Sequence, residues 1–199
     1  MDAAQSDRHR SSVGGIAPLH LLIVLALIAL QIGGLAAMGK PWICKCGHVA
    51  LWYANPSGPE TSQHITDWYT YSHVIHGLGF YFLLWLIAPG ASIGFRLAAA
   101  IGLEAGWELF ENTPMIIERY RQGGLAQGYV GDSVINSVAD TGAAILGFLL
   151  ARALPVWLSI TLLVATEAFL AYAIRDNLLL NIIQLVHPSE ALTRWQSGK

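Results

Sequence analysis

Long apolar stretches alternate with shorter polar ones along this chain, a pattern that predicts helices crossing a membrane. A helix needs about 20 apolar residues to cross about 30 Å of hydrocarbon. Stretches that reach or approach this length cover residues 18–38, 69–88, 94–113, 133–151 and 156–174. We therefore expect an all-α membrane protein, built as a bundle of about five transmembrane helices.

The segments outside these spans complete the expected organisation. Residues 1–17 form a polar N-terminal tail, and residues 18–175 are expected to make a single transmembrane helical domain. The one long loop, between the first two spans, is rich in aromatic residues, as expected of a cap at the membrane–water interface. Residues 176–199 contain an apolar stretch too short to cross, so we expect a C-terminal interfacial segment.

The first span allows two interpretations. Its flanking Arg8 and Arg10, its apolar core and its small residues Gly33 and Gly34 resemble a secretory signal peptide. The apolar run is longer than the core of a usual signal peptide, which favours an uncleaved anchor.

Composition supports the membrane class and excludes others. The hydrophobic set makes up 54% of the residues, while Asp, Glu, Lys and Arg together make up only 12%, about half the share usual in soluble domains. A net charge of −2 argues against a nucleic-acid partner, and two cysteines cannot build a disulfide scaffold.

Polar residues of the later spans should meet at one end of the bundle. Successive helices run in opposite directions, so the second begins, the third ends and the fourth begins on the same side. Each carries a narrow polar stripe there, made by His73 and His76, by Glu104, Glu108, Glu111 and Asn112, and by Asp132, Asn136 and Asp140. Such stripes are costly against lipid, so they should face one another around an intramembrane pocket.

The ionisable members of the stripes are the candidate catalytic residues: Glu108, Glu111, His73, His76 and Asp140. A buried carboxyl or imidazole can act as a general acid or base. So many acids can lie together only if they are protonated, paired with basic groups or bound to a cation. The alternative is that these groups only join helices by hydrogen bonds, which is our interpretation of the lone Glu167 in the fifth span.

A divalent metal is the one cofactor that the residue types suggest. Imidazole and carboxylate groups suit such an ion, and the candidate ligands are His73, His76 and Asp132. The chain has neither an HExxH motif nor the Glu-x-x-His pattern of di-iron bundles, so the spacing itself is not a metal signature.

Arginines and amides beside the stripes are the candidate substrate-binding residues: Arg119, Arg121, Arg175, Asn112 and Asn136. A guanidinium can bind a phosphate with two parallel hydrogen bonds. The alternative for the arginines before the glycine-rich segment 123–131 is a hydrated loop, in which they pair with nearby acids.

Two local motifs carry weaker signals. Cys44 and Cys46 in CKCGH could hold a soft metal or form a redox pair, but two ordinary thiols are favoured, since a disulfide across one residue would be strained. Gly102 and Gly106 form a GxxxG motif, and Gly77 follows the histidines, which indicates close helix packing.

These observations favour a membrane-embedded hydrolase or transferase, with a lipid or polyprenyl headgroup as its substrate and membrane lipids as its surroundings. Whether the chain is an enzyme stays open at this point. The alternatives are a non-catalytic assembly or scaffold factor and, less favoured, a proton or ion conduit. A conduit would need polar groups toward the far leaflet, yet the third and fourth spans turn apolar beyond Glu104 and Thr141.

Separated motifs also resemble a known family. SQHITDWYTYSHVIHG, EAGWELFENTPMIIERYR, GYVGDSVINSVADT and IRDNLLLN follow one another as in an uncharacterised bacterial family of small multi-pass membrane proteins, found mainly in proteobacteria. The resemblance covers about residues 40–198 and implies a location in the bacterial inner membrane, but no activity. A fainter similarity to VanZ-like membrane proteins rests on the order of acidic and amide residues alone.

Overall fold

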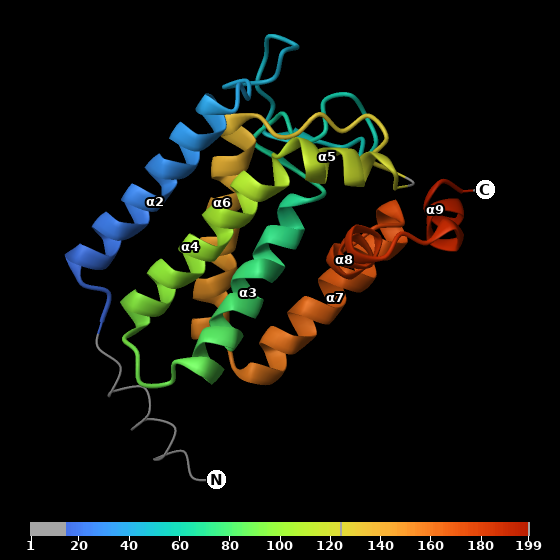
Figure 1. Cartoon of the computed structure of the whole chain (residues 1–199). Helices are drawn as coiled ribbons and strands as arrows, with labels where there is room; N and C mark the ends of the chain where they lie inside the picture. Colours follow the sequence, from blue (N-terminus) through green and yellow to red (C-terminus); the bar gives the residue numbers. More distant parts are fainter. Residues whose placement is uncertain (1–14, 124, 199) are drawn as a thin grey trace.

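The computed structural model describes residues 15–123 and 125–198, so almost all of the predicted polar tail lies outside the described part. The long helices are α2 (Pro18–Ala37), α3 (Thr70–Ile87), α4 (Ile93–Glu111), α6 (Val134–Ala153) and α7 (Val156–Ile174). They form one bundle in which consecutive helices run in opposite directions (Figure 1). The short helices are α5 (Pro114–Arg121), α8 (Leu178–Val186) and α9 (Glu190–Gln196).

The all-α class is confirmed, and each predicted span coincides with a long helix. Of the described helices, four are long and apolar enough to cross a membrane: α2, α3, α6 and α7. α4 is 19 residues long but carries Arg96, Glu104, Glu108 and Glu111. Its place inside the bundle fits a fifth span whose charges face neighbouring helices, and the count of five stays a prediction.

Serine side chains cap the N-termini of two of the long helices, α4 and α6. The Ser92 side chain accepts a hydrogen bond from the Phe95 N–H at 3.1 Å, and the Ser133 side chain accepts one from the Asn136 N–H at 3.3 Å. Such caps satisfy backbone donors that have no partner inside the helix. The cap at Ser133 fixes where α6 begins and thereby which of its side chains face α3 and α4.

α3 and α6 touch backbone to backbone at a pair of glycines. A Cβ atom on Gly77 would lie 2.0 Å from the Ala144 carbonyl oxygen, and one on Gly147 would lie 2.0 Å from the Val74 carbonyl oxygen. Only glycine permits this approach. The contact expected of the GxxxG pair is wrong: a Cβ on Gly106 would meet nothing within 4 Å.

The hydrophobic core fills the bundle away from the loops. Val24, Leu84, Leu97, Ile101 and Phe148 are buried there, contributed by α2, α3, α4 and α6. α2 belongs to this bundle, and α7 is more peripheral, since of its residues only Leu170 and Ile174 are buried. The outer faces of α2 and α7 are apolar and exposed, as expected of helices that meet lipid.

Loops cover the end of the bundle where α3 begins. The loop of residues 38–69 and helix α5 lie over this end, and α8 and α9 lie beside the upper end of α7 (Figure 1). Two short strands within the loop, β1 (Trp52–Tyr53) and β2 (Thr66–Asp67), pair in parallel. An aromatic cluster joins the loop to α3 and α7 through Trp52, Trp68, Tyr71 and Phe169.

The expectation of two ordinary thiols in this loop is wrong. Cys44 and Cys46 are joined in a disulfide. Their Cα atoms lie 5.1 Å apart, within the range that disulfides take, in a turn that is closed by a hydrogen bond from the Gly47 N–H to the Cys44 carbonyl at 3.1 Å. Chemistry that needs free thiols therefore requires prior reduction of this bond.

Candidate functional site

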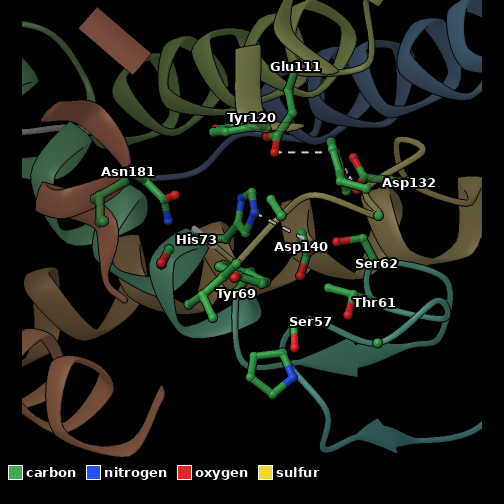
Figure 2. A pocket seen from close by; sticks show the side chains of 18 of the residues that line it. Ser57, Thr61, Ser62, Tyr69, His73, Glu111, Tyr120, Asp132, Asp140 and Asn181 are labelled. Atoms are coloured by element: carbon green, nitrogen blue, oxygen red, sulfur yellow. Dashed lines mark hydrogen bonds and ion pairs between the residues drawn. The ribbon is translucent and has the colours of Figure 1, made fainter. Parts of the chain in front are cut away.

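A cavity opens at the capped end of the bundle, between the start of α3, the end of α4 and the start of α6. About 70 Å³ is accessible to the centres of water-sized molecules, enough for a few waters or a small polar group. The polar residues that line it are Ser57, Thr61, Ser62, Tyr69, Ser72, His73, His76, Glu111, Tyr120, Tyr129, Asp132, Asp140 and Asn181. Figure 2 shows Glu111 and Tyr120 on one side of this space, with His73 and Asp140 facing them.

Glu104 holds both histidines from behind the cavity. Its Oε1 lies 2.6 Å from His73 Nδ1, and its Oε2 lies 3.0 Å from His76 Nδ1. Glu104 is fully buried, so its carboxylate is stabilised by hydrogen bonds from these two imidazoles and not by water. When both Nδ1 atoms carry the proton toward Glu104, each ring keeps Nε2 as its basic nitrogen.

Two further acids complete the cluster around His73. Glu108 Oε1 lies 3.3 Å from His73 Nδ1, and Asp140 Oδ2 lies 3.9 Å from His73 Nε2. These groups come from α3, α4 and α6, and the glycine contact between α3 and α6 brings Asp140 within reach of His73. The predicted convergence of the polar stripes is therefore present in the fold.

A hydrogen-bonded chain leads from this cluster toward α2. Ser137 Oγ donates to Glu108 Oε2 at 2.6 Å, Gln31 Nε2 donates to Ser137 Oγ at 2.7 Å, and Thr141 Oγ1 donates to Gln31 Oε1 at 2.8 Å. Gln31 and Thr141 are fully buried. The contribution of α2 was missed from the sequence, although a lone glutamine in an apolar span is a signal that it needs a buried partner.

Several buried polar atoms on α3, α4 and α6 have no hydrogen-bond partner among the described residues. They are Ser72 Oγ, Glu108 Oε1, Asp140 Oδ1 and both side-chain polar atoms of Asn136. Leaving a buried polar group unpaired costs about 1–3 kcal/mol, more for a charged one. A concentration of such atoms at one place calls for a physical reason.

Asp132 lies in a separate part of the cavity wall. It accepts hydrogen bonds from Asn112 Nδ2 and from the Tyr129 hydroxyl, the latter at 2.8 Å, while its own N–H donates to Asn112 Oδ1 at 2.8 Å. Burial raises the pKa of Asp132, and these donors partly offset that rise. In the described part of the chain, Asp132 does not join His73 and His76 in a set of converging ligand atoms, contrary to the expected ligand set.

The candidate arginines lie outside the described cavity lining and bond mainly to backbone. Arg119 donates to the Leu185 and Val186 carbonyls at the end of α8, Arg121 to the Tyr129 carbonyl and Arg175 to the Trp195 carbonyl. A guanidinium placed at the carbonyl end of a helix is a common stabilising arrangement. The expected role of these arginines as direct phosphate ligands in the cavity has no geometric basis.

The other predicted site residues do gather in or behind the cavity. His73, His76, Glu111 and Asp140 line it, and Glu108 lies directly behind it. The two amides are outside the described cavity lining: Asn112 bonds to Asp132, and Asn136 is buried with its side chain unpaired. Tyrosines 69, 120 and 129 were missed, because the sequence does not show whether an aromatic side chain in a loop, at the start of a helix or on a short helix such as α5 points into a cavity.

Glu167 joins α7 to α8 and not to another span. Its two oxygens accept hydrogen bonds from the Leu178 and Leu179 N–H groups, both at 3.1 Å, at the start of α8. Asp176, at the turn between these helices, accepts from the Tyr69 hydroxyl and from Gln196. Burial raises the pKa of Asp176 to about 6. The C-terminal segment is thus tied to the bundle through the half-buried Glu167 and the buried Asp176.

Comparisons with known proteins agree with the resemblance seen in the motifs. Residues 35–198 match the family described as "Protein of unknown function (DUF2585)". The chain is 51% identical over 180 residues to a UPF0314 protein of Brucella anthropi, covering 90% of this chain and 91% of the relative. It is 47% identical over 186 residues to a UPF0314 protein of Sphingopyxis alaskensis, covering 94% and 99%. The comparisons give no support to the VanZ similarity, and no solved structure matches the chain.

Proposed function

Because the chain belongs to the DUF2585 family of proteobacterial proteins, whose description names no reaction, we propose a function from the site itself. The proposal is a multi-pass protein of the bacterial inner membrane that acts as a hydrolase or transferase on a lipid or polyprenyl headgroup. The observation that supports it best is the pair of imidazoles held at Nδ1 by the buried Glu104 beside a polar cavity.

His76 is the acid–base group of this proposal. Its side chain is 14% exposed and lines the cavity, so it can meet a substrate, while Glu104 fixes its orientation and proton position. A carboxylate that holds Nδ1–H leaves Nε2 free to accept a proton from an attacking water or hydroxyl and to return it to the leaving group. Glu111 faces the same space and offers a second proton-transfer group.

A lipid substrate fits the surroundings of the cavity. The outer faces of α2 and α7 are apolar, and the aromatic cluster of Trp52, Trp68, Tyr71 and Phe169 resembles the belts found at membrane interfaces. We therefore place the cavity near one interface, where a headgroup enters from the side while its chains stay in lipid.

The buried polar chain disfavours an ion or proton conduit. Beyond Glu108 it continues through Ser137, Gln31 and Thr141, and the core around Leu97, Ile101 and Phe148 lies toward the other end of the bundle. A path for protons or ions needs polar groups across the whole bilayer. A dead-end pocket is the better description of this arrangement.

The test is turnover by the full chain purified in mild detergent. Mixed micelles containing phospholipids or polyprenyl phosphates are incubated with the protein, and released headgroups or phosphate are measured by mass spectrometry. His76→Gln should lower the rate by about 10²-fold or more, since a positioned acid–base group contributes about 10²–10⁴-fold. His48→Gln is the matched control, because that loop imidazole is exposed and outside the cavity lining.

The enzyme proposal is overturned if the wild type turns over none of the substrates faster than His76→Gln does. In that case, growth of a deletion strain rescued equally by the wild type and by His76→Gln would support a scaffold role instead.

A further inference from the structure

The cluster around His73 has the composition and geometry of an ion site. We infer that the protein binds a divalent metal ion between α3, α4 and α6, held by the His73 imidazole and the carboxylates of Glu108 and Asp140. This ligand set differs from the one expected from the sequence in using Glu108 and Asp140 in place of His76 and Asp132. The inference deepens the proposed function, since the ion would act in the same cavity.

Geometry is the first support. Each of the three residues offers one ligand atom, and these atoms all lie within 4.8 Å of one another. Donors that share one ion at about 2.1 Å lie no more than about 4.2 Å apart, so sub-ångström side-chain shifts would close the set around an ion. All three side chains are more than nine-tenths buried, which shields the site from competing water.

The unpaired polar atoms are the second and independent support. Glu108 Oε1 and Asp140 Oδ1 have no hydrogen-bond partner among the described residues, and both belong to the proposed ligands. Asn136, also buried and unpaired, lies on α6 one turn before Asp140. Glu108 Oε1 lies 3.3 Å from His73 Nδ1, but that nitrogen is already bonded to Glu104, so a cation would be the partner that satisfies both carboxylate oxygens at once.

The groups behind the ligands are arranged as metal sites require. Glu104 Oε1 holds His73 at Nδ1, which leaves Nε2 on the side of Asp140, and Ser137 Oγ holds Glu108 through Oε2. Carboxylates that fix a histidine and donors that fix a carboxylate orient ligands in this way in metalloproteins. One imidazole with two carboxylates suits Mn²⁺ or Zn²⁺ better than a purely oxygen-seeking ion.

Charge gives the ion a role toward a substrate. Among the described residues that line the cavity there are three acids, Glu111, Asp132 and Asp140, and no lysine or arginine. A phosphate group would therefore be repelled by the protein alone. A bound divalent ion would supply the positive charge that a phosphate needs and would polarise it.

Metal content is measured on the full chain in mild detergent, loaded with Mn²⁺ or Zn²⁺ and then desalted, with the disulfide kept intact. Elemental analysis should find about one ion per chain. Asp140→Asn and Glu108→Gln should each raise the Mn²⁺ Kd, measured by electron paramagnetic resonance, by about 100-fold or more, since even loss of an outer partner costs about 10–100-fold. Pulsed resonance on the wild type should show nitrogen coupling from an imidazole.

Two control variants identify the site. Asp132→Asn removes a buried acid of the same cavity and should keep wild-type affinity. His64→Gln should also keep it, because that residue belongs to the separate cluster with Cys44, Cys46 and Glu60.

The inference is overturned if the wild type holds no stoichiometric metal, or if Asp140→Asn and Glu108→Gln both bind as tightly as the wild type. Lost affinity in Asp132→Asn alone would favour the other ligand set and also overturn it. The nitrogen coupling is measured on the wild type. If it is absent from the metal-loaded protein, His73 is not a ligand, whether or not the variants fold. Metal bound without any turnover leaves this inference standing and removes the proposed reaction. Turnover by a wild type that takes up no stoichiometric metal leaves the proposed reaction standing and overturns this inference.

Discussion

The glycine contact between α3 and α6 gives the sharpest test of the fold around the site. In Gly77→Ala the new Cβ would lie 2.0 Å from the Ala144 carbonyl oxygen and 2.6 Å from the Phe148 nitrogen. Both are backbone atoms, so relief requires the helices to move apart by more than an ångström. Gly79→Ala is the matched control, two residues along the same helix, where a Cβ would meet nothing within 4 Å.

Gly77→Ala should be less stable than Gly79→Ala. Alanine in place of glycine inside a helix gains about 0.5–1 kcal/mol. Gly79→Ala should show this gain alone, whereas Gly77→Ala adds an overpacking penalty of about 1–3 kcal/mol, or more because backbone cannot repack. Since both variants share the gain, they differ by this penalty, and about 1–3 kcal/mol corresponds to about 2–12 °C in apparent Tm for a chain of this size.

Thermal unfolding of the detergent-purified variants, followed by tryptophan fluorescence, measures this difference. Gly77→Ala should also weaken Mn²⁺ binding, because separation of the helices moves Asp140 away from His73. Equal Tm values for the two variants would refute the close α3–α6 contact as described.

Three further predictions concern acidic side chains. Because the pKa of Asp176 is raised from 3.8 to about 6, the folded state binds a proton that the unfolded state releases in this window, so stability falls as pH rises from 4 to 6, by about 3 kcal/mol. Asp176→Asn should flatten this part of the Tm–pH profile, and parallel profiles would contradict the assignment. Glu104→Gln should raise the Mn²⁺ Kd by about 10–100-fold with the ion still bound, and unchanged affinity would refute its orienting role. Glu167→Ala should cost about 0.5–2 kcal/mol and speed amide exchange at Leu178 and Leu179, whereas unchanged exchange there would exclude the cap.

The helices and their polar faces were predictable because both depend on local periodicity. Apolar runs placed the long helices within about two residues, and a repeat of 3.6 residues put Glu104 and Glu108 on one face of α4. The alternation of helix direction then brought His73 and Asp140 to the same end of the bundle. These steps need no knowledge of how tightly two helices approach.

The pairing of individual groups was not predictable, because it depends on contacts between distant segments. Gly102 and Gly77 look equally suited to close packing in the sequence, yet only Gly77 lies against backbone. Likewise Asp132 and Asp140 share one face of a helical projection, but Asp132 precedes α6 and bonds to Asn112 at the end of α4. The helix boundary at Ser133 thus separates two acids that periodicity had grouped.

The arginines show why charge sign alone is a poor guide to a binding role. Arg119 and Arg121 stand near a glycine-rich segment, which suggested a phosphate clamp, but their guanidinium groups bond to the carbonyls of α8 and of residue Tyr129. Backbone carbonyls without a partner accept hydrogen bonds from nearby arginine side chains, and the C-terminal end of a helix presents several such carbonyls. With these arginines occupied, the positive charge for an anionic headgroup must come from elsewhere, and the buried carboxylates of Glu108 and Asp140 are suited to hold an ion that supplies it.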